Sequence, residues 1–139
     1  MKYKYSHVSG QHNIDGSALK RPAVWVDISN GKQTRRFVAL IDSGADHITM
    51  SSRMAEVFGI ERNDKQNRPM LGITMETVDG FVAELTFQIE DLQGSFIAPV
   101  VFINSPQVPI LLGREGFFDK YRITFEQDHD TFEITPALK

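Results

Sequence analysis

Asp42 is the residue of this sequence best placed to do chemistry. It follows an apolar run at 37–41 and is followed at once by Ser43 and Gly44. A carboxylate at the end of a buried strand, in a tight glycine turn, loses part of its hydration, which costs free energy. Such a residue is expected there only if hydrogen bonds stabilise the carboxylate or catalysis requires it. Asp, Ser and Gly are also common turn formers, so an Asp bonded to its own backbone is the alternative interpretation.

The other reactive side chains do not form the sequence patterns of the commonest catalytic and metal-binding sites. Cysteine is absent, which excludes disulfides, thiolate nucleophiles and cysteine-bound metals. Ser43 lacks the glycine two residues before it that the nucleophile turn of a serine hydrolase requires. Asp42 and Asp46 do not follow the spacing of a calcium-binding EF-hand loop. The histidines show no metal-ligand spacing, so we expect no bound metal; they are His7, His12, His47 and His129.

Length and charge narrow the class of protein further. The chain has 139 residues, 41% of them hydrophobic, and we predict one domain over 20–139 preceded by an N-terminal arm at 1–19. Lys and Arg number 15 against 18 Asp and Glu, and the basic residues are scattered, so no nucleic-acid partner is expected. No apolar run approaches the roughly 20 residues that cross a membrane, and no signal segment is recognisable at the start. Together with the lack of cysteine, these features favour a cytoplasmic protein without a membrane partner.

The turn signals are spaced as in an all-β protein. Strands are predicted at 23–28 and 36–41, joined by a turn in which Asn30 and Gly31 both take positive φ. Apolar and polar residues alternate along 81–89, so one face of that strand is expected in the core. Further strands are expected at 95–102 and 110–112 and in a last hairpin made of 122–125 and 132–135.

Helix signals are few. Ser51 or Ser52 can cap a short helix that stops at Gly59, and 114–120 is at most a turn or two. Trp25 is expected to be a core residue rather than a platform for substrate.

Three short strings stand out in this all-β chain. They are Ala-Leu-Ile-Asp-Ser-Gly-Ala-Asp at 39–46, Ile-Leu-Leu-Gly-Arg at 110–114, and Arg21-Pro22. Together they resemble the active-site turn, the strand-Gly-Arg motif and the Arg-Pro pair of the retropepsin-like aspartic proteases, the single-domain relatives of pepsin that include retroviral proteases. The resemblance covers roughly 21–126, and it implies a flattened barrel with a flap hairpin and one or two short helices.

The resemblance implies an aspartic endopeptidase. In this chemistry one ionised carboxyl polarises a water and one protonated carboxyl donates to the peptide carbonyl. Because the nucleophile is that water, no cofactor is expected. The chain has one such string, so the second carboxyl has to come from a second copy, and we expect a homodimer with Asp42 of each subunit on the two-fold axis. The substrate is expected to be a peptide or an unfolded protein. Two carboxyl groups held so close share one proton, so activity should peak at acidic to mildly acidic pH.

The resemblance also assigns roles beside Asp42. Ser43 is expected to bond across the axis to the turn of the second copy. Gly44 lets the substrate backbone approach closely, and Ala45 keeps the floor of the cleft small, so that it contacts substrate.

An ion pair is expected beneath the site. Asp46, which is also expected to contact substrate, pairs with Arg114, and Arg21 of the other subunit joins them, because a guanidinium can engage a carboxylate with two donors. The alternative for either arginine is a surface charge without a partner.

A flap is expected between the helix and the alternating strand, at 69–81, where it closes over bound peptide. Its substrate contacts are expected from Gly72, Ile73, Thr74 and Met75. Val108 and Ile110 are expected to line the wall of the cleft. The alternatives are an ordinary exposed hairpin for the flap and core packing for the wall residues.

A second function hypothesis keeps the fold and the dimer but not the turnover. It is a non-catalytic module that binds peptides or acts as a scaffold, and an inert monomer is the third hypothesis. Fold alone does not separate these hypotheses from the enzyme.

Overall fold

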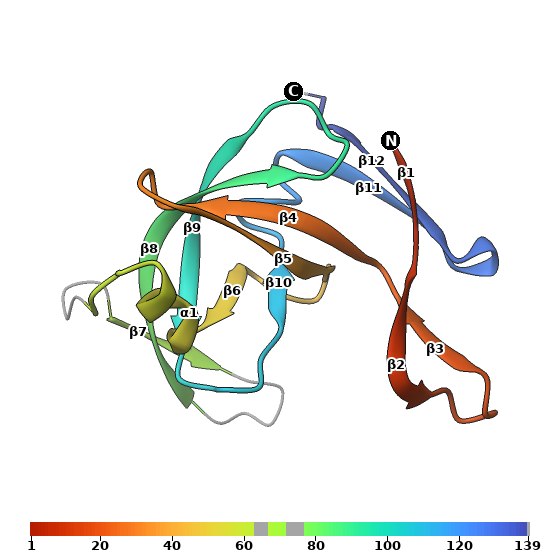
Figure 1. The fold of residues 1–139 in the computed structure, drawn as a ribbon, viewed down its shortest axis with the longest axis horizontal. Coiled ribbons are helices and arrows are strands. Elements are labelled where there is room, and N and C mark those ends of the chain that lie inside the picture. The colour runs from red at the N-terminus through yellow and green to blue at the C-terminus, as the bar shows by residue number, and fades with distance from the viewer. Residues whose placement is uncertain (63–66, 72–76, 139) are drawn as a thin grey trace.

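The computed structural model describes residues 1–62, 67–71 and 77–138, with the backbone alone at 67–71 and 77–78. Strands dominate it, as predicted (Figure 1). In chain order the elements are β1 (Lys2–Lys4), β2 (Ser6–His12), β3 (Ala18–Arg21), β4 (Ala23–Ser29), β5 (Thr34–Ile41), β6 (Ile48–Ser51), α1 (Ser52–Val57), β7 (Asn67–Leu71), β8 (Thr77–Ile89), β9 (Phe96–Ile103), β10 (Ile110–Leu112), β11 (Tyr121–Glu126), the 3-10 helix η2 (Gln127–His129) and β12 (Thr131–Pro136).

A closed barrel forms the body of the molecule. Its sheet has the strand order β4-β5-β10-β6-β9-β8-β7, and β4 also pairs with β8, so that the sheet closes on itself. The prediction of an all-β barrel with a short helix is therefore confirmed. No helix in the described part of the chain is long and apolar enough to span a membrane.

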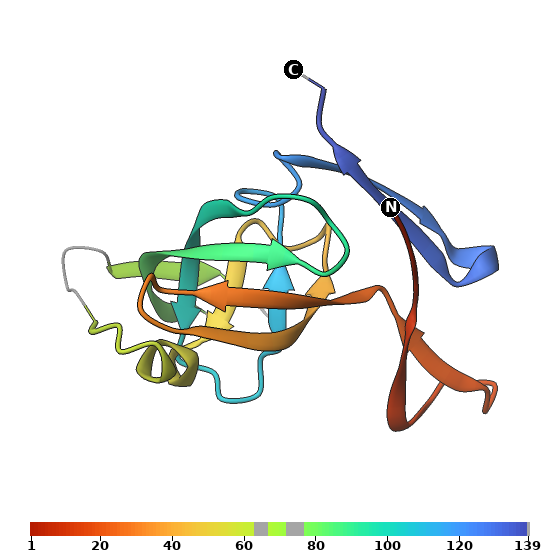
Figure 2. The same cartoon turned by 45° about the horizontal axis from the view of Figure 1, so that its top comes forward.

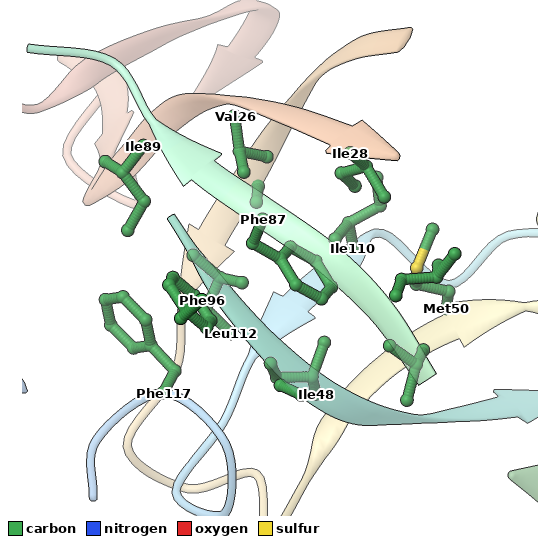
Figure 3. Packing of buried hydrophobic residues seen from close by; sticks show 14 of the residues in the cluster. Val26, Ile28, Ile48, Met50, Phe87, Ile89, Phe96, Ile110, Leu112 and Phe117 are labelled. Carbon is green, nitrogen blue, oxygen red and sulfur yellow. The ribbon is translucent and has the colours of Figure 1, made fainter. Parts of the chain in front are cut away.

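The barrel interior is filled by the inward faces of the alternating strands. Along β8, Phe81, Leu85, Phe87 and Ile89 are buried, as the period-two pattern predicts. Phe87 stacks on Phe96 of β9 with ring centroids 5.4 Å apart. Figure 3 shows these rings together with the inward-pointing residues Val26, Ile28, Ile48, Leu112 and Phe117.

Trp25 does not belong to this core, and the prediction that it does is wrong. Its side chain is 47% exposed, because Val24 and Val26 on either side of it point inward and β4 alternates. The guanidinium of Arg36 lies over the outward-facing indole, 5.5 Å from the ring centroid.

The turn between β4 and β5 also differs from the prediction. Gly31 has positive φ (93°), whereas Asn30 does not. Asn30 instead uses its side chain: its Oδ1 accepts hydrogen bonds at 2.9 Å from the backbone N–H groups of Lys32 and Gln33. The loop spans the four residues between Ser29 and Thr34, which is why a two-residue turn was not required.

The helix forms where its cap was predicted. Ser51 is the N-cap of α1, and its Oγ accepts a hydrogen bond from the Arg53 N–H at 3.3 Å. Gly59 follows the helix with φ 65°, the left-handed conformation that ends a helix.

Two smaller sheets project from the barrel (Figures 1 and 2). The first has the strand order β1-β12-β11 and so joins the two ends of the chain. Tyr3 of β1 stacks on the buried Phe132 of β12, with ring centroids 5.2 Å apart. The second is the β2–β3 hairpin, which begins in the predicted N-terminal arm at 1–19 and extends two residues beyond it, to Arg21.

Candidate active site

Asp42 lies directly after β5, in the connection from β5 to β6. The short strand β10 lies between these two strands, parallel to β5 and antiparallel to β6. The backbone N–H of Asp42 donates to the Leu112 carbonyl at 3.1 Å, which continues the β5–β10 ladder beyond the end of β5. The position of Asp42 is therefore set by backbone pairing with a strand about seventy residues further along the chain.

Hydrogen bonds inside the turn orient the carboxylate. The Gly44 N–H donates to Asp42 Oδ1 at 2.9 Å, and the Ala45 N–H donates to the Asp42 carbonyl at 3.2 Å. Asp42 is half-buried, whereas Ser43 and Gly44 are exposed. Oδ1 thus has a backbone donor, as in the turn interpretation, while Oδ2 accepts no hydrogen bond within the described residues.

Asp46 and Arg114 lie together beside this turn. Arg114 Nη2 donates to Asp46 Oδ1 at 2.8 Å, and both side chains are about two-thirds exposed. Two backbone hydrogen bonds of 2.8 Å accompany the ion pair, from the Arg114 N–H to the Ala45 carbonyl and from the Glu115 N–H to the Asp46 carbonyl. The Asp42 turn is thereby joined at Ala45 and Asp46 to the segment after β10.

Gly113 is a residue of this site whose physical role sequence reasoning missed. A Cβ at this position would lie 2.2 Å from the His47 carbonyl oxygen and 2.7 Å from the Ala45 carbonyl oxygen. Only glycine lets the two backbones approach this closely. The sequence signal is the glycine directly after an apolar strand, but it does not reveal which backbone the glycine faces.

The other predicted site residues are spread over three regions. Arg21 is exposed at the end of β3, on the hairpin that projects from the barrel. Val108 is half-buried, while Ile110 is 8% exposed and packs in the core. Leu111 of the same strand faces outward and pairs with Leu40. The predicted flap contacts lie outside the described residues; they are Gly72, Ile73, Thr74 and Met75.

The arms on either side of those flap residues are described. Strands β7 and β8 pair antiparallel from Asn67 opposite Phe81 to Leu71 opposite Thr77.

Among the residues that the structure describes, no group of three or more His, Asp or Glu side chains is arranged to hold a metal ion. The groups that the described residues bring to the site are the carboxylates of Asp42 and Asp46, the guanidinium of Arg114, the hydroxyl of Ser43 and the backbone amides of the turn.

Comparisons with known proteins gave one family match and several similar solved structures. Residues 24–115 match the family described as aspartyl protease. The chain is similar to the crystal structure of a retropepsin-like aspartic protease from Rickettsia conorii, with a TM-score of 0.59 and 14% identity, covering 97% of this chain and 98% of that chain. It is also similar to the EIAV protease complexed with the inhibitor HBY-793, with a TM-score of 0.53 and 19% identity, covering 75% of this chain and 88% of that chain. A comparison with curated proteins gave no match.

The family match and the two structural likenesses agree. The matched segment covers more than half of the chain, from β4 to just beyond Arg114, and contains the Asp42 turn. The solved structures, at under 20% identity, support the fold. The chain therefore belongs to the aspartyl protease family and has the retropepsin-like fold.

Proposed function

We propose that the protein is a homodimeric aspartic endopeptidase that hydrolyses peptide bonds with a water held between Asp42 of one subunit and Asp42 of the other. The observation that carries the proposal is the Asp42 carboxylate, which follows a barrel strand in a turn that is held by β10 and exposed at Ser43 and Gly44. Membership of the aspartyl protease family supports the same chemistry.

The proposed reaction needs two carboxyl groups in different protonation states. The ionised one takes a proton from water as the oxygen attacks the peptide carbonyl, and the protonated one donates to that carbonyl oxygen. One chain supplies the Asp-Ser-Gly string once, so a second copy completes the site. The paired carboxyl groups share one proton, which gives a bell-shaped dependence of activity on pH with its maximum on the acidic side.

Neighbouring residues have supporting roles in this proposal. Ser43, exposed beside Asp42, donates across the two-fold axis to the turn of the second copy. Arg21 of the second copy approaches the exposed Asp46–Arg114 pair and adds a cation to it. Gly44 and Ala45 form a floor small enough for an extended peptide backbone, and the flap covers that peptide from above.

The test compares the wild type with Asp42→Asn on a mixed peptide library between about pH 4 and 7. We expect the wild type to cleave and the variant to lose about 10³-fold or more in kcat, because the Asn amide does not ionise and cannot act as a general acid or base. Asp91→Asn is the matched control, since Asp91 is exposed in the turn after β8 with φ 61°, a conformation that Asn tolerates well.

Three outcomes separate the hypotheses. Cleavage that survives Asp42→Asn eliminates the proposed chemistry. No cleavage by either protein, together with saturable binding of library peptides, favours the non-catalytic peptide-binding module. Equal loss of activity in Asp91→Asn would assign the effect to folding rather than to the site.

A further inference from the structure

His47 lies at the far end of the Asp42 turn, directly before β6. It forms an isolated parallel bridge with Glu115, and its Nδ1 lies 3.4 Å from Glu115 Oε1. The His47 side chain is 21% exposed and that of Glu115 is 50% exposed, so this pair is less exposed than the Asp46–Arg114 pair beside it. Solvent and salt therefore screen it less.

The backbone around this pair is closely packed. The His47 carbonyl accepts a hydrogen bond from Thr49 Oγ1 at 3.1 Å, and a Cβ at Gly113 would lie 2.2 Å from that carbonyl oxygen. The Glu115 N–H donates to the Asp46 carbonyl at 2.8 Å. Glu115 therefore contacts the end of the turn twice, with its backbone at Asp46 and with its carboxylate at His47.

Backbone hydrogen bonds link this end of the turn to the Asp42 carboxylate. Segment 112–115 accepts from the Asp42 N–H at one end and donates to the Ala45 and Asp46 carbonyls at the other. Between these contacts the Ala45 N–H donates to the Asp42 carbonyl, and the Gly44 N–H donates to Asp42 Oδ1. A separation of segment 112–115 from the end of the turn therefore reaches Asp42 through Ala45.

The charge that His47 meets is that of Glu115. Asp46 precedes His47 and pairs with Arg114 at 2.8 Å, so their charges largely cancel. The strands beside the turn add no charge, because β6, β9 and β10 contain no charged residue. Imidazole groups change charge between about pH 5 and 8, whereas carboxylates are mostly ionised above about pH 5. The pair therefore joins opposite charges at mildly acidic pH and loses the positive one as the pH rises.

We propose that His47 is a positioning residue for Asp42: when protonated, it pairs with Glu115 and holds the turn against the segment after β10. The inference rests on the proposed function, because the hold is strongest at the acidic pH at which the paired carboxyl groups act. The hold is present while the imidazole is charged and is lost as the imidazole releases its proton. The Asp46–Arg114 pair keeps both charges over this range and adds no such pH dependence.

Hydrogen exchange of the Arg114 and Glu115 backbone N–H groups measures this hold, since both groups donate to the turn. After correction for the intrinsic effect of pH, we expect their protection in the wild type to be about two- to fivefold greater at about pH 5.5 than at about pH 7.5. Glu115→Gln keeps the shape of the side chain but not its charge, and it should abolish this difference. His47→Lys stays charged throughout, and it should retain the greater protection at both pH values.

Asp128→Asn is the matched control for the loss of a carboxylate beside a histidine. His129 Nε2 lies 3.5 Å from Asp128 Oδ2, but these side chains are 69% and 79% exposed and lie in η2 of the C-terminal hairpin. The variant should leave the protection of the Arg114 and Glu115 N–H groups unchanged at either pH.

Peptide cleavage tests whether the hold serves catalysis. We expect Glu115→Gln to lower kcat about threefold at about pH 5.5 with little change in KM, because positioning acts on the reacting carboxyl group. The loss should be smaller at about pH 7.5, where the imidazole of the wild type is largely neutral.

The exchange and cleavage measurements can each overturn the inference. Protection that does not depend on pH in the wild type, or that depends on it equally in Glu115→Gln, removes the role of the pair. An unchanged kcat in Glu115→Gln at acidic pH makes the contact merely structural. If the wild type cleaves no peptide at any pH, the proposed function fails, and the exchange measurement still decides whether His47 holds the Asp42 turn.

Discussion

At the active-site turn, backbone hydrogen bonds contribute more to the geometry than the ion pair beside them. The Asp46 and Arg114 side chains are about two-thirds exposed, and such pairs contribute at most about 1 kcal/mol. The N–H of Arg114 and that of Glu115, by contrast, bond directly to the Ala45–Asp46 backbone. The side chain of Arg114 therefore adds little to the stability of the single chain through its ion pair.

Gly113 makes this backbone contact possible. We predict that Gly113→Ala lowers the free energy of unfolding by about 3 kcal/mol or more, because the new Cβ would lie 2.2 Å from the His47 carbonyl oxygen and the two backbone segments would have to separate. The measurement is urea unfolding of the variant and the wild type under the same conditions.

Gly31→Ala is the control for this prediction. Unlike Gly113, Gly31 has positive φ, and nothing lies within 4 Å of the Cβ it would gain. Its cost should be that of the backbone conformation alone, about 1 kcal/mol. Equal losses in the two variants would contradict the account of Gly113.

At the scale of the elements, the sequence predicts strands best where a pattern alternates between core and solvent. Strand β8 has such a pattern, and its inward residues are those expected. Strand β6 has no such pattern, because three of its four residues are buried and its extended form depends on pairing with β9 and β10. The polar strand β2 has no hydrophobic pattern from which a strand could be predicted. The local sequence signal there is the Asp15-Gly16 turn that follows it.

The candidate site shows the same division between local and long-range information. Asp42 could be singled out because its chemistry and its turn are local in sequence. The Asp46–Arg114 pair was expected only from the family resemblance, and the approach of Gly113 to His47 was not expected. Both depend on how β10 inserts between β5 and β6, which no spacing reveals. The prediction for Trp25 was wrong because it relied on the size of the side chain, which favours the core. The alternation of β4 instead points this side chain outward.

Strand β1 ties the N-terminus to the rest of the molecule through Tyr3. Its hydroxyl donates to the Glu90 carbonyl at 2.6 Å. Burial, aided by the charges of Asp91 and Glu90, raises the pKa of Tyr3 to about 12 from its ordinary value of 10.0. Because the folded-state pKa is the higher one, the neutral phenol favours folding below pH 10, and this stabilisation is lost as pH rises toward 12.

We therefore predict that the free energy of unfolding falls between about pH 10 and 12, and that Tyr3→Phe makes this fall shallower. Burial also raises the pKa of Tyr121, so part of the slope remains, and Tyr121→Phe should have the smaller effect. The measurement is denaturant unfolding at several pH values. A slope as steep in Tyr3→Phe as in the wild type would contradict the prediction.

At the scale of the whole molecule, the terminal sheet offers a second copy a place to pair. Within the described chain, β1 and β11 are the edges of the β1-β12-β11 sheet, and their outer backbone groups have no strand beside them. The sheet and the β2–β3 hairpin project from the same side of the barrel in both views (Figures 1 and 2). A two-fold dimer that used this side would bury these edges.

Subunit mixing tests this shared site most directly. Wild-type protein is held at one concentration while Asp42→Asn is added, and peptide cleavage is followed after the subunits have exchanged. A mixed dimer has one aspartate and is inactive, so an equal amount of the variant should lower the rate to about half, whereas the same amount of added wild type should raise it. A rate that does not change as the variant is added would mean that each chain carries a complete site, and would contradict the account.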